Sequence, residues 1–233
     1  MPLSSPESLT YSVPTQAECL LHIPADPHTS DLLVLTLHGY GMNAQSMLDL
    51  TLMLVGSDRI VASLQGPNQF YQELGQPRTA ICYNWGTHRH SAANIRLHHD
   101  MVRSVRRQLQ DRFHIGPERT LLIGFSQSVG FGYRFAGTYP DEIGGVIGIC
   151  GGVPRDWETG PYLPVTAAVL HIARAEDEFY PAEVTATYGE KLRRHASDVT
   201  FHLLPGGHRI PSQGRAIIEP WIERVFKPRV FKS

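Results

Sequence analysis

This sequence contains several near-continuous apolar runs, and they restrict its fold more than any other feature. They cover residues 32–37, 60–64, 120–123, 143–149 and 167–172. Strands that are buried on both faces read as such runs, because helices cover both sides of a parallel sheet. Between the runs, Met101, Val105 and Leu109 recur every four residues and predict an amphipathic helix over 95–112. This alternation predicts an open, mostly parallel α/β sheet with helices on both faces.

The remaining segments add an edge to this sheet. Apolar side chains alternate with polar ones at Leu9, Tyr11 and Val13, and again over 17–23 after Pro14. Period-two alternation is typical of half-buried strands, so we expect an antiparallel N-terminal hairpin. Further helices are expected over 44–55, 127–138, 181–196 and 212–225, and a further strand over 199–204.

One stretch, residues 66–94, departs from the strand–helix rhythm. The chain of 233 residues carries no linker or repeat and is expected to form a single domain over 1–233. Residues 66–94 are rich in Asn, Gln, Gly and Pro but carry Phe70, Tyr71, Tyr83 and Trp85. Long loops in compact domains are commonly functional, so we expect an aromatic loop or cap insertion. Its rings are candidate substrate-binding residues, and packing within the loop is the alternative.

Charge and cysteine content exclude several classes of partner. The chain has 21 Lys and Arg against 22 Asp and Glu, so no long-range field draws it to nucleic acid or to an anionic membrane. Its cysteines, Cys19, Cys82 and Cys150, form no Cys-x-x-Cys pair and are expected to be buried thiols, not metal ligands. The sequence contains no signal peptide and no membrane span, which predicts a cytoplasmic protein without stable membrane insertion.

The segment TLLIGFSQSVG, residues 120–130, predicts a buried strand, a sharp turn and a helix, with Ser126 at the turn. A serine on such an elbow projects its hydroxyl above the sheet, where the next N–H and the helix dipole can stabilise an oxyanion. The usual pattern is G-x-S-x-G, and here Ser128 stands in place of the second glycine. Taken alone, the segment equally fits a strand-to-helix turn with a capping serine.

A serine nucleophile requires a base, and the base requires a group that orients it. Among twelve histidines, His208 follows the strand expected over 199–204 and a Gly-Gly turn, which places it on a loop at a strand end. Asp177 follows another expected strand, and Glu176 is the alternative. The order serine, acid, histidine along the chain makes Ser126, Asp177 and His208 the candidate catalytic residues.

The loop HGYGMN, residues 38–43, directly follows the first of the apolar runs. Its glycines allow backbone N–H groups to point inward. We therefore expect the N–H groups of Tyr40 and Gln127 to form a two-donor oxyanion hole. His38 is interpreted as a structural loop histidine and not as a second base.

Four motifs in order, HGYGMN, GFSQS, EDEFYP and GGHRIP, resemble the phospholipase/carboxylesterase family of α/β-hydrolases, which includes acyl-protein thioesterases and bacterial carboxylesterases. The resemblance spans about residues 30–225. The family's elbow commonly reads GFSQGG and its acid loop D-x-V-V-P, so this chain departs at Ser128-Val129 and at Phe179-Tyr180. The resemblance implies an α/β-hydrolase fold and a serine carboxylesterase that acts through an acyl-enzyme, with no metal or organic cofactor.

The expected substrate is a small-molecule ester with a short or medium acyl chain. Lysophospholipid and thioester substrates remain open, as does a homodimer. The same fold also supports peptidases and carbon–carbon hydrolases, and the altered elbow leaves room for a non-catalytic ligand-binding relative. Lysophospholipase or thioesterase activity needs a long apolar channel, whereas a short cavity leaves only small esters.

Overall fold

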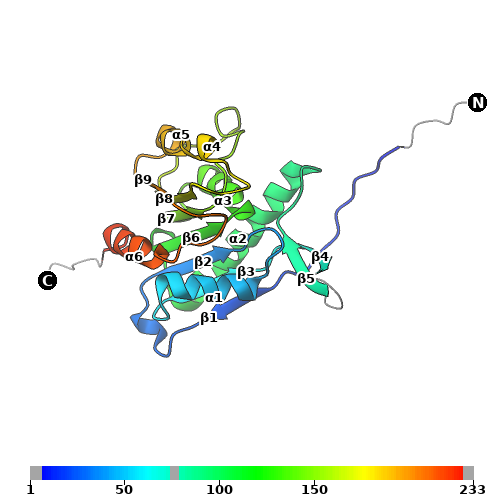
Figure 1. The fold of residues 1–233 in the computed structure, drawn as a ribbon. Coiled ribbons are helices and arrows are strands. Elements are labelled where there is room, and N and C mark those ends of the chain that lie inside the picture. Colours follow the sequence, from blue (N-terminus) through cyan, green and yellow to red (C-terminus); the bar gives the residue numbers. More distant parts are fainter. Residues whose placement is uncertain (1–6, 74–78, 228–233) are drawn as a thin grey trace, which may run out of the picture.

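A computed structural model describes residues 7–73 and 79–227 of the chain. Its centre is a seven-stranded sheet in the order β1-β3-β2-β6-β7-β8-β9 (Figure 1). The strands are β1 Cys19–His22, β2 Leu33–Leu37, β3 Ile60–Leu64, β6 Thr120–Phe125, β7 Gly145–Ile149, β8 Ala168–Arg174 and β9 Val199–Leu204. Every neighbouring pair is parallel except β1 with β3. The mostly parallel α/β sheet predicted from the sequence is confirmed.

Helices cover both faces of this sheet (Figure 1). They are α1 Ala44–Val55, α2 Ser91–Phe113, α3 Gln127–Thr138, α4 Ala182–Thr185, α5 Tyr188–His195 and α6 Gly214–Val225, with short 3-10 helices η1 Pro27–Thr29 and η2 Pro117–Arg119. Side chains alternate across a strand, so β2 supplies two apolar layers. Leu35 packs in the layer that includes α2 and α3, and Val34 in the layer that includes α1 and α6.

Of the N-terminal hairpin expected from the sequence, the second strand forms as β1, but the first strand does not form and the prediction of a hairpin is wrong. Leu9, Tyr11 and Val13 form no strand and are 85%, 77% and 69% exposed. This segment leads away from the sheet in Figure 1. β1 pairs with β3 instead, with Cys19 opposite Leu64. Alternating apolar residues form a strand only where a neighbouring strand accepts their backbone hydrogen bonds, and β3 provides that edge only to β1.

The expected insertion at 66–94 contains an antiparallel hairpin of β4 Asn68–Glu73 and β5 Thr79–Asn84, which forms a separate two-stranded sheet. It is therefore not a simple loop. A backbone bridge joins the hairpin to the segment after β2, because the Gly41 N–H donates to the Tyr83 carbonyl at 2.9 Å and the Tyr83 N–H donates to the Met42 carbonyl at 3.1 Å. The hairpin thereby holds the loop that follows β2.

Three helices differ in their bounds from the sequence expectation. The helix expected over 95–112 is α2, which begins four residues earlier and ends one residue later. The helix expected over 181–196 is divided into α4 and α5, and the described helix α6 begins at Gly214 rather than at Ser212. Pro220 lies inside α6. The Pro220 ring does not end the helix, because the packed Ile218, Trp221 and Ile222 side chains hold this turn against the sheet.

Candidate active site

The candidate catalytic residues gather at one edge of the sheet because they follow parallel strands. Ser126 follows β6, Asp177 lies beyond the end of β8, His208 lies beyond β9, and Tyr40 lies in the loop after β2. The carboxyl ends of parallel strands meet at the same edge, which is where open α/β sheets bind ligands. The topology thus collects side chains that are far apart in the sequence.

Two hydrogen bonds connect the three expected side chains. The His208 Nε2 atom lies 2.9 Å from Ser126 Oγ, and His208 Nδ1 lies 2.8 Å from Asp177 Oδ2. The second carboxylate oxygen of Asp177 accepts the N–H groups of Phe179 and Tyr180 at 2.9 and 3.0 Å. These two donors fix the carboxylate, so that Oδ2 faces the imidazole. An Nδ1–H held in this way leaves Nε2 as the proton acceptor for Ser126.

The backbone at Ser126 is held in a strained conformation, with φ 55° and ψ −116°. Such conformations cost about 1–3 kcal/mol and persist only where the surroundings enforce them. Here the Ser126 N–H donates to the Ile149 carbonyl at 2.9 Å. The elbow also packs against glycines: a Cβ on Gly151 would lie 2.6 Å from the Ser126 carbonyl oxygen, and one on Gly39 would lie 2.9 Å from Phe125.

Ser128, which occupies the place of a glycine in the usual elbow motif, fits without displacing its neighbours. Its side chain is fully buried. Its hydroxyl accepts the Phe125 N–H at 3.0 Å and lies 2.8 Å from the Leu37 carbonyl oxygen, to which it donates. Leu37 ends β2, so this hydroxyl connects the elbow to the strand that leads into the loop carrying Tyr40.

Ser128→Ala is expected to lower the free energy of unfolding by about 1–2 kcal/mol, because buried backbone groups of Phe125 and Leu37 lose a hydrogen-bonding partner. Urea denaturation measures the change. The matched control is Ser212→Ala, since Ser212 is exposed and its removal is expected to change stability by less than about 0.5 kcal/mol. Equal unfolding free energies for both variants would contradict the structural importance of the Ser128 hydroxyl.

The two expected oxyanion donors are both accessible to a ligand. Gln127 is the first residue of α3, a position whose N–H has no intrahelical acceptor. The Tyr40 N–H makes no hydrogen bond with any residue in the described ranges. Its loop is held on either side, because the Gly41 N–H is bonded to the hairpin and the Met42 N–H donates to the Gly39 carbonyl at 3.3 Å.

Hydrogen bonds from the buried His38 stabilise this loop. The side chain is fully buried, and burial lowers its pKa, which favours the neutral imidazole. Its Nδ1 lies 2.7 Å from the Gly39 carbonyl oxygen and its Nε2 accepts the Gly66 N–H at 2.9 Å. The Trp85 indole N–H donates to the His38 carbonyl at 2.8 Å. Both ring nitrogens of His38 are therefore used for structure.

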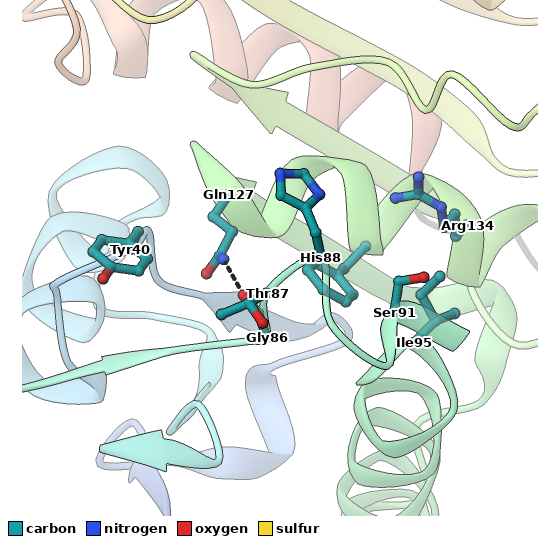
Figure 2. A pocket seen from close by; sticks show the side chains of 9 residues that line it. Tyr40, Gly86, Thr87, His88, Ser91, Ile95, Gln127 and Arg134 are labelled. Carbon is teal, nitrogen blue, oxygen red and sulfur yellow. Dashed lines mark hydrogen bonds between the residues drawn. The ribbon is translucent and has the colours of Figure 1, made fainter. Parts of the chain in front are cut away.

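A cavity of about 400 Å³ adjoins the oxyanion donors (Figure 2). Its lining residues are Tyr40, Gly86, Thr87, His88, Ser91, Ile95, Gln127, Phe131 and Arg134. Gln127, Phe131 and Arg134 follow one another at helical spacing i, i+4, i+7 and so share one face of α3. The spacing predicts that these three residues share a face, but it does not indicate that this face borders a cavity.

The aromatic residues expected to bind substrate lie elsewhere. The described residues that line the cavity do not include Phe70, Tyr71, Tyr83 or Trp85. Trp85 is fully buried and Tyr71 is 77% exposed. Phe70 packs against the Tyr40 ring, with centroids 5.1 Å apart. Trp85 is therefore a packing residue. Phe70 contacts Tyr40, which lines the cavity, but Phe70 does not itself line it.

Two aromatic residues after Asp177 lie beside the imidazole, at the positions where the acid loop departs from the D-x-V-V-P pattern. The His208 ring lies 4.8 Å from the Phe179 ring and 5.9 Å from the Tyr180 ring, measured between centroids. Burial raises the pKa of the Tyr180 phenol, and a side-chain hydrogen bond to Ser126 opposes that rise. The Phe179 side chain is 69% exposed, so its ring borders His208 at the surface of the protein.

Cys150, Asp177 and His208 form the group of described residues whose ligand atoms lie close enough for a metal ion, within 4.8 Å of one another. Two of these residues already bond to each other through Asp177 Oδ2 and His208 Nδ1. Burial raises the pKa of the Cys150 thiol to about 12, so this side chain remains a thiol at neutral pH. The thiol donates to the Arg209 carbonyl at 3.3 Å. A metal ion here would have to displace both hydrogen bonds.

Comparison with known proteins identifies the family. The model of the phospholipase/carboxylesterase family matches residues 21–225. The chain belongs to this family. Membership makes it a hydrolase of the carboxylesterase/phospholipase type, as the four sequence motifs implied. Among curated proteins, none matches the sequence.

Solved structures share the fold of this phospholipase/carboxylesterase family member. The carboxylesterase of Bacillus cereus is 18% identical with a TM-score of 0.68, and the match covers 90% of this chain and 95% of that one. Esterase PE8 is 20% identical with a TM-score of 0.72, covering 91% and 100%. SOBER1 of Arabidopsis thaliana is 18% identical with a TM-score of 0.69, covering 84% and 99%. Within the described ranges, no helix is long and apolar enough to span a membrane.

Proposed function

We propose that this chain is a serine carboxylesterase that cleaves small esters through an acyl-enzyme on Ser126. The observation that carries the proposal is the continuous hydrogen-bonded series from Asp177 through His208 to Ser126. The strained backbone at Ser126 also supports the proposal. This conformation presents the hydroxyl above the sheet, and its unfavourable free energy must be offset by the surrounding contacts.

The first half of the reaction forms the acyl-enzyme. Ser126 Oγ attacks the ester carbonyl carbon while His208 Nε2 accepts the hydroxyl proton. The N–H groups of Tyr40 and Gln127 stabilise the oxyanion, and each donor of this kind typically contributes about 2.7–4 kcal/mol. Asp177 stabilises the imidazolium of His208. The imidazolium then gives its proton to the leaving alcohol as the carbon–oxygen bond breaks.

The second half releases the acid. A water molecule takes the place of the alcohol, and His208 accepts its proton as the water oxygen attacks the acyl carbon. The same two N–H donors stabilise the second oxyanion. When the bond to Ser126 breaks, the imidazolium returns its proton to Ser126 Oγ. The cycle ends with the carboxylic acid released and the hydrogen bonds of the resting site restored.

The adjoining cavity favours small esters over lipids. Its volume of about 400 Å³ lies near the lower end of the range for ligand pockets. Its lining contains only two aliphatic or phenyl side chains, Ile95 and Phe131, beside several polar ones. A long acyl chain, as in lysophospholipid or in an acyl thioester of fatty-acid length, would leave most of its apolar surface unburied. We therefore propose short acyl esters as substrates.

A substrate panel tests this function. Purified protein is assayed against p-nitrophenyl esters of acetate, butyrate, octanoate and palmitate, and in parallel against aminoacyl p-nitroanilides. The proposal expects the highest kcat/KM with acetate or butyrate, a decline with octanoate and palmitate, and no comparable turnover of the anilides. Preferential cleavage of anilides would favour a peptidase, and preferential cleavage of palmitate would favour a lipid substrate. Either result would overturn the proposed substrate class.

A further inference from the structure

The cavity beside the oxyanion donors has an uneven distribution of charge. Tyr40 and Arg134 lie at opposite ends of it, with Gln127 between them (Figure 2). Arg134 is the one lining residue with a permanent charge, and no Asp or Glu is among the described residues that line the cavity. Thr87 and Ser91 add hydroxyl groups to the same walls. The end remote from Tyr40 therefore carries a positive charge with no carboxylate in the described lining to oppose it.

One edge of the Arg134 guanidinium is held by an acid outside the cavity lining. Its Nε and Nη2 donate to the Asp156 carboxylate at 3.0 and 2.6 Å. The Tyr162 hydroxyl donates to the same carboxylate at 2.9 Å. Burial alone would raise the pKa of Asp156, but the hydrogen bonds from Arg134 and Tyr162 outweigh it and lower the pKa, so the carboxylate is ionised. Asp156 thus fixes the plane and direction of the guanidinium.

The other edge of the guanidinium is partly open. A guanidinium has five N–H groups in a fixed fork. Nη1 also donates one N–H to the Gly130 carbonyl at 3.2 Å. The Tyr162 hydroxyl is a further hydrogen-bonding partner of the guanidinium. With Nε and one N–H each of Nη1 and Nη2 also in use, at least one of the five N–H groups has no partner in the described chain, and the side chain is 21% exposed. Such an N–H can donate a charge-assisted hydrogen bond to a carboxylate oxygen.

We propose that this cavity binds a carboxylate carried by the ester substrate, with Arg134 as its binding group. The inference rests on the proposed esterase function and names its substrate class: a small ester with an anionic end. The carbons between the ester and the carboxylate would contact Ile95 and Phe131, which also line the cavity. Since Asp156 already balances one positive charge, the gain comes mainly from charge-assisted hydrogen bonding.

Two matched substrate pairs test the proposal and locate the carboxylate. Monoethyl glutarate is compared with ethyl valerate, which has the same acyl length without the charge. The acetate ester of γ-hydroxybutyrate is compared with butyl acetate, which places the charge on the alcohol side. Acid release at constant pH gives kcat and KM. For the wild type, we expect kcat/KM to be about tenfold to a hundredfold higher for the charged member of one pair, mainly through KM.

Arg134→Gln is expected to remove this preference, so that the ratio of kcat/KM between the charged and the neutral ester of the pair falls to about one. Arg103→Gln is the matched control, because Arg103 is also paired with a carboxylate, that of Glu142, but does not line the cavity. This control is expected to keep the preference. Should Arg134→Gln fail to fold, the wild-type comparison decides alone, since equal kcat/KM within both pairs overturns the proposal.

The failure of this proposal differs from the failure of the esterase function. Equal turnover of charged and neutral esters, together with labelling of the protein by a fluorophosphonate, would reject the role of Arg134 alone. No hydrolysis of any of the four esters and no labelling would reject both. A charged-ester preference that survives in Arg134→Gln would also overturn the assignment, because the carboxylate would then be bound by another group.

Discussion

Ser126→Ala is expected to lower kcat/KM for p-nitrophenyl butyrate by about four or more orders of magnitude, because the variant has no nucleophile for His208 to activate. The assay is release of p-nitrophenolate under conditions where the wild type turns over many times. Alanine keeps the Cβ and therefore the backbone strain at this position, so the thermal unfolding midpoint is expected to change little. Loss of activity with an unchanged midpoint separates a chemical role from a structural one.

Ser212→Ala serves as the control for this comparison, because Ser212 is an exposed serine whose hydroxyl bonds to Gln213 and takes no part in the hydrogen-bonded series. It is expected to retain wild-type activity. If Ser126→Ala keeps more than about a hundredth of the wild-type kcat/KM, another residue must act as nucleophile. The assignment of His208 as its base would then fail as well.

Asp177→Asn is expected to lower kcat by about four orders of magnitude, through the tautomer of His208. The side-chain oxygen of the asparagine would take the place of Oδ1, which accepts the N–H groups of Phe179 and Tyr180. Its NH₂ group would then face His208 Nδ1 and donate to it. The imidazole would carry its proton on Nε2 and could not accept one from Ser126. Single-turnover kinetics with p-nitrophenyl butyrate measures the acylation step directly.

Glu176→Gln is the matched control, because Glu176 is the neighbouring acid that the sequence left open. Its carboxylate accepts the Gly206 N–H, a bond that the amide oxygen of glutamine can also accept. We expect kcat to remain within about threefold of the wild type. A large loss in Glu176→Gln with near-normal activity in Asp177→Asn would exchange the roles of these two acids.

The central sheet could be predicted from the sequence because its signals are local. The run over residues 120–125 and the helix α3 that follows are each defined by their own apolar pattern and by the turn at Ser126. The N-terminal hairpin could not be predicted in this way. Leu9 and Tyr11 have the right alternation, but whether they form a strand depends on a partner far away in the sequence, and β3 pairs with β1 instead.

The hydrogen-bonded side chains of the site could be located because their positions follow from topology. Ser126, Asp177 and His208 each follow a strand, and parallel strands end at one edge. The cavity could not be located from the same information. Aromatic composition pointed to Trp85, but this ring is fully buried and bonds to the carbonyl of His38. Which helix face borders a cavity depends on how the helix packs, and the sequence alone does not state it.

Mass spectrometry of the protein after brief reaction with a fluorophosphonate tests the central claim most directly. The reagent reacts rapidly only with an activated serine. The account predicts one adduct per chain, on the tryptic peptide covering residues 120–134, with fragment ions that assign it to Ser126 and not to Ser128. His208→Ala is expected to slow the labelling strongly. An adduct on any other residue, or none while the protein hydrolyses esters, would contradict the account.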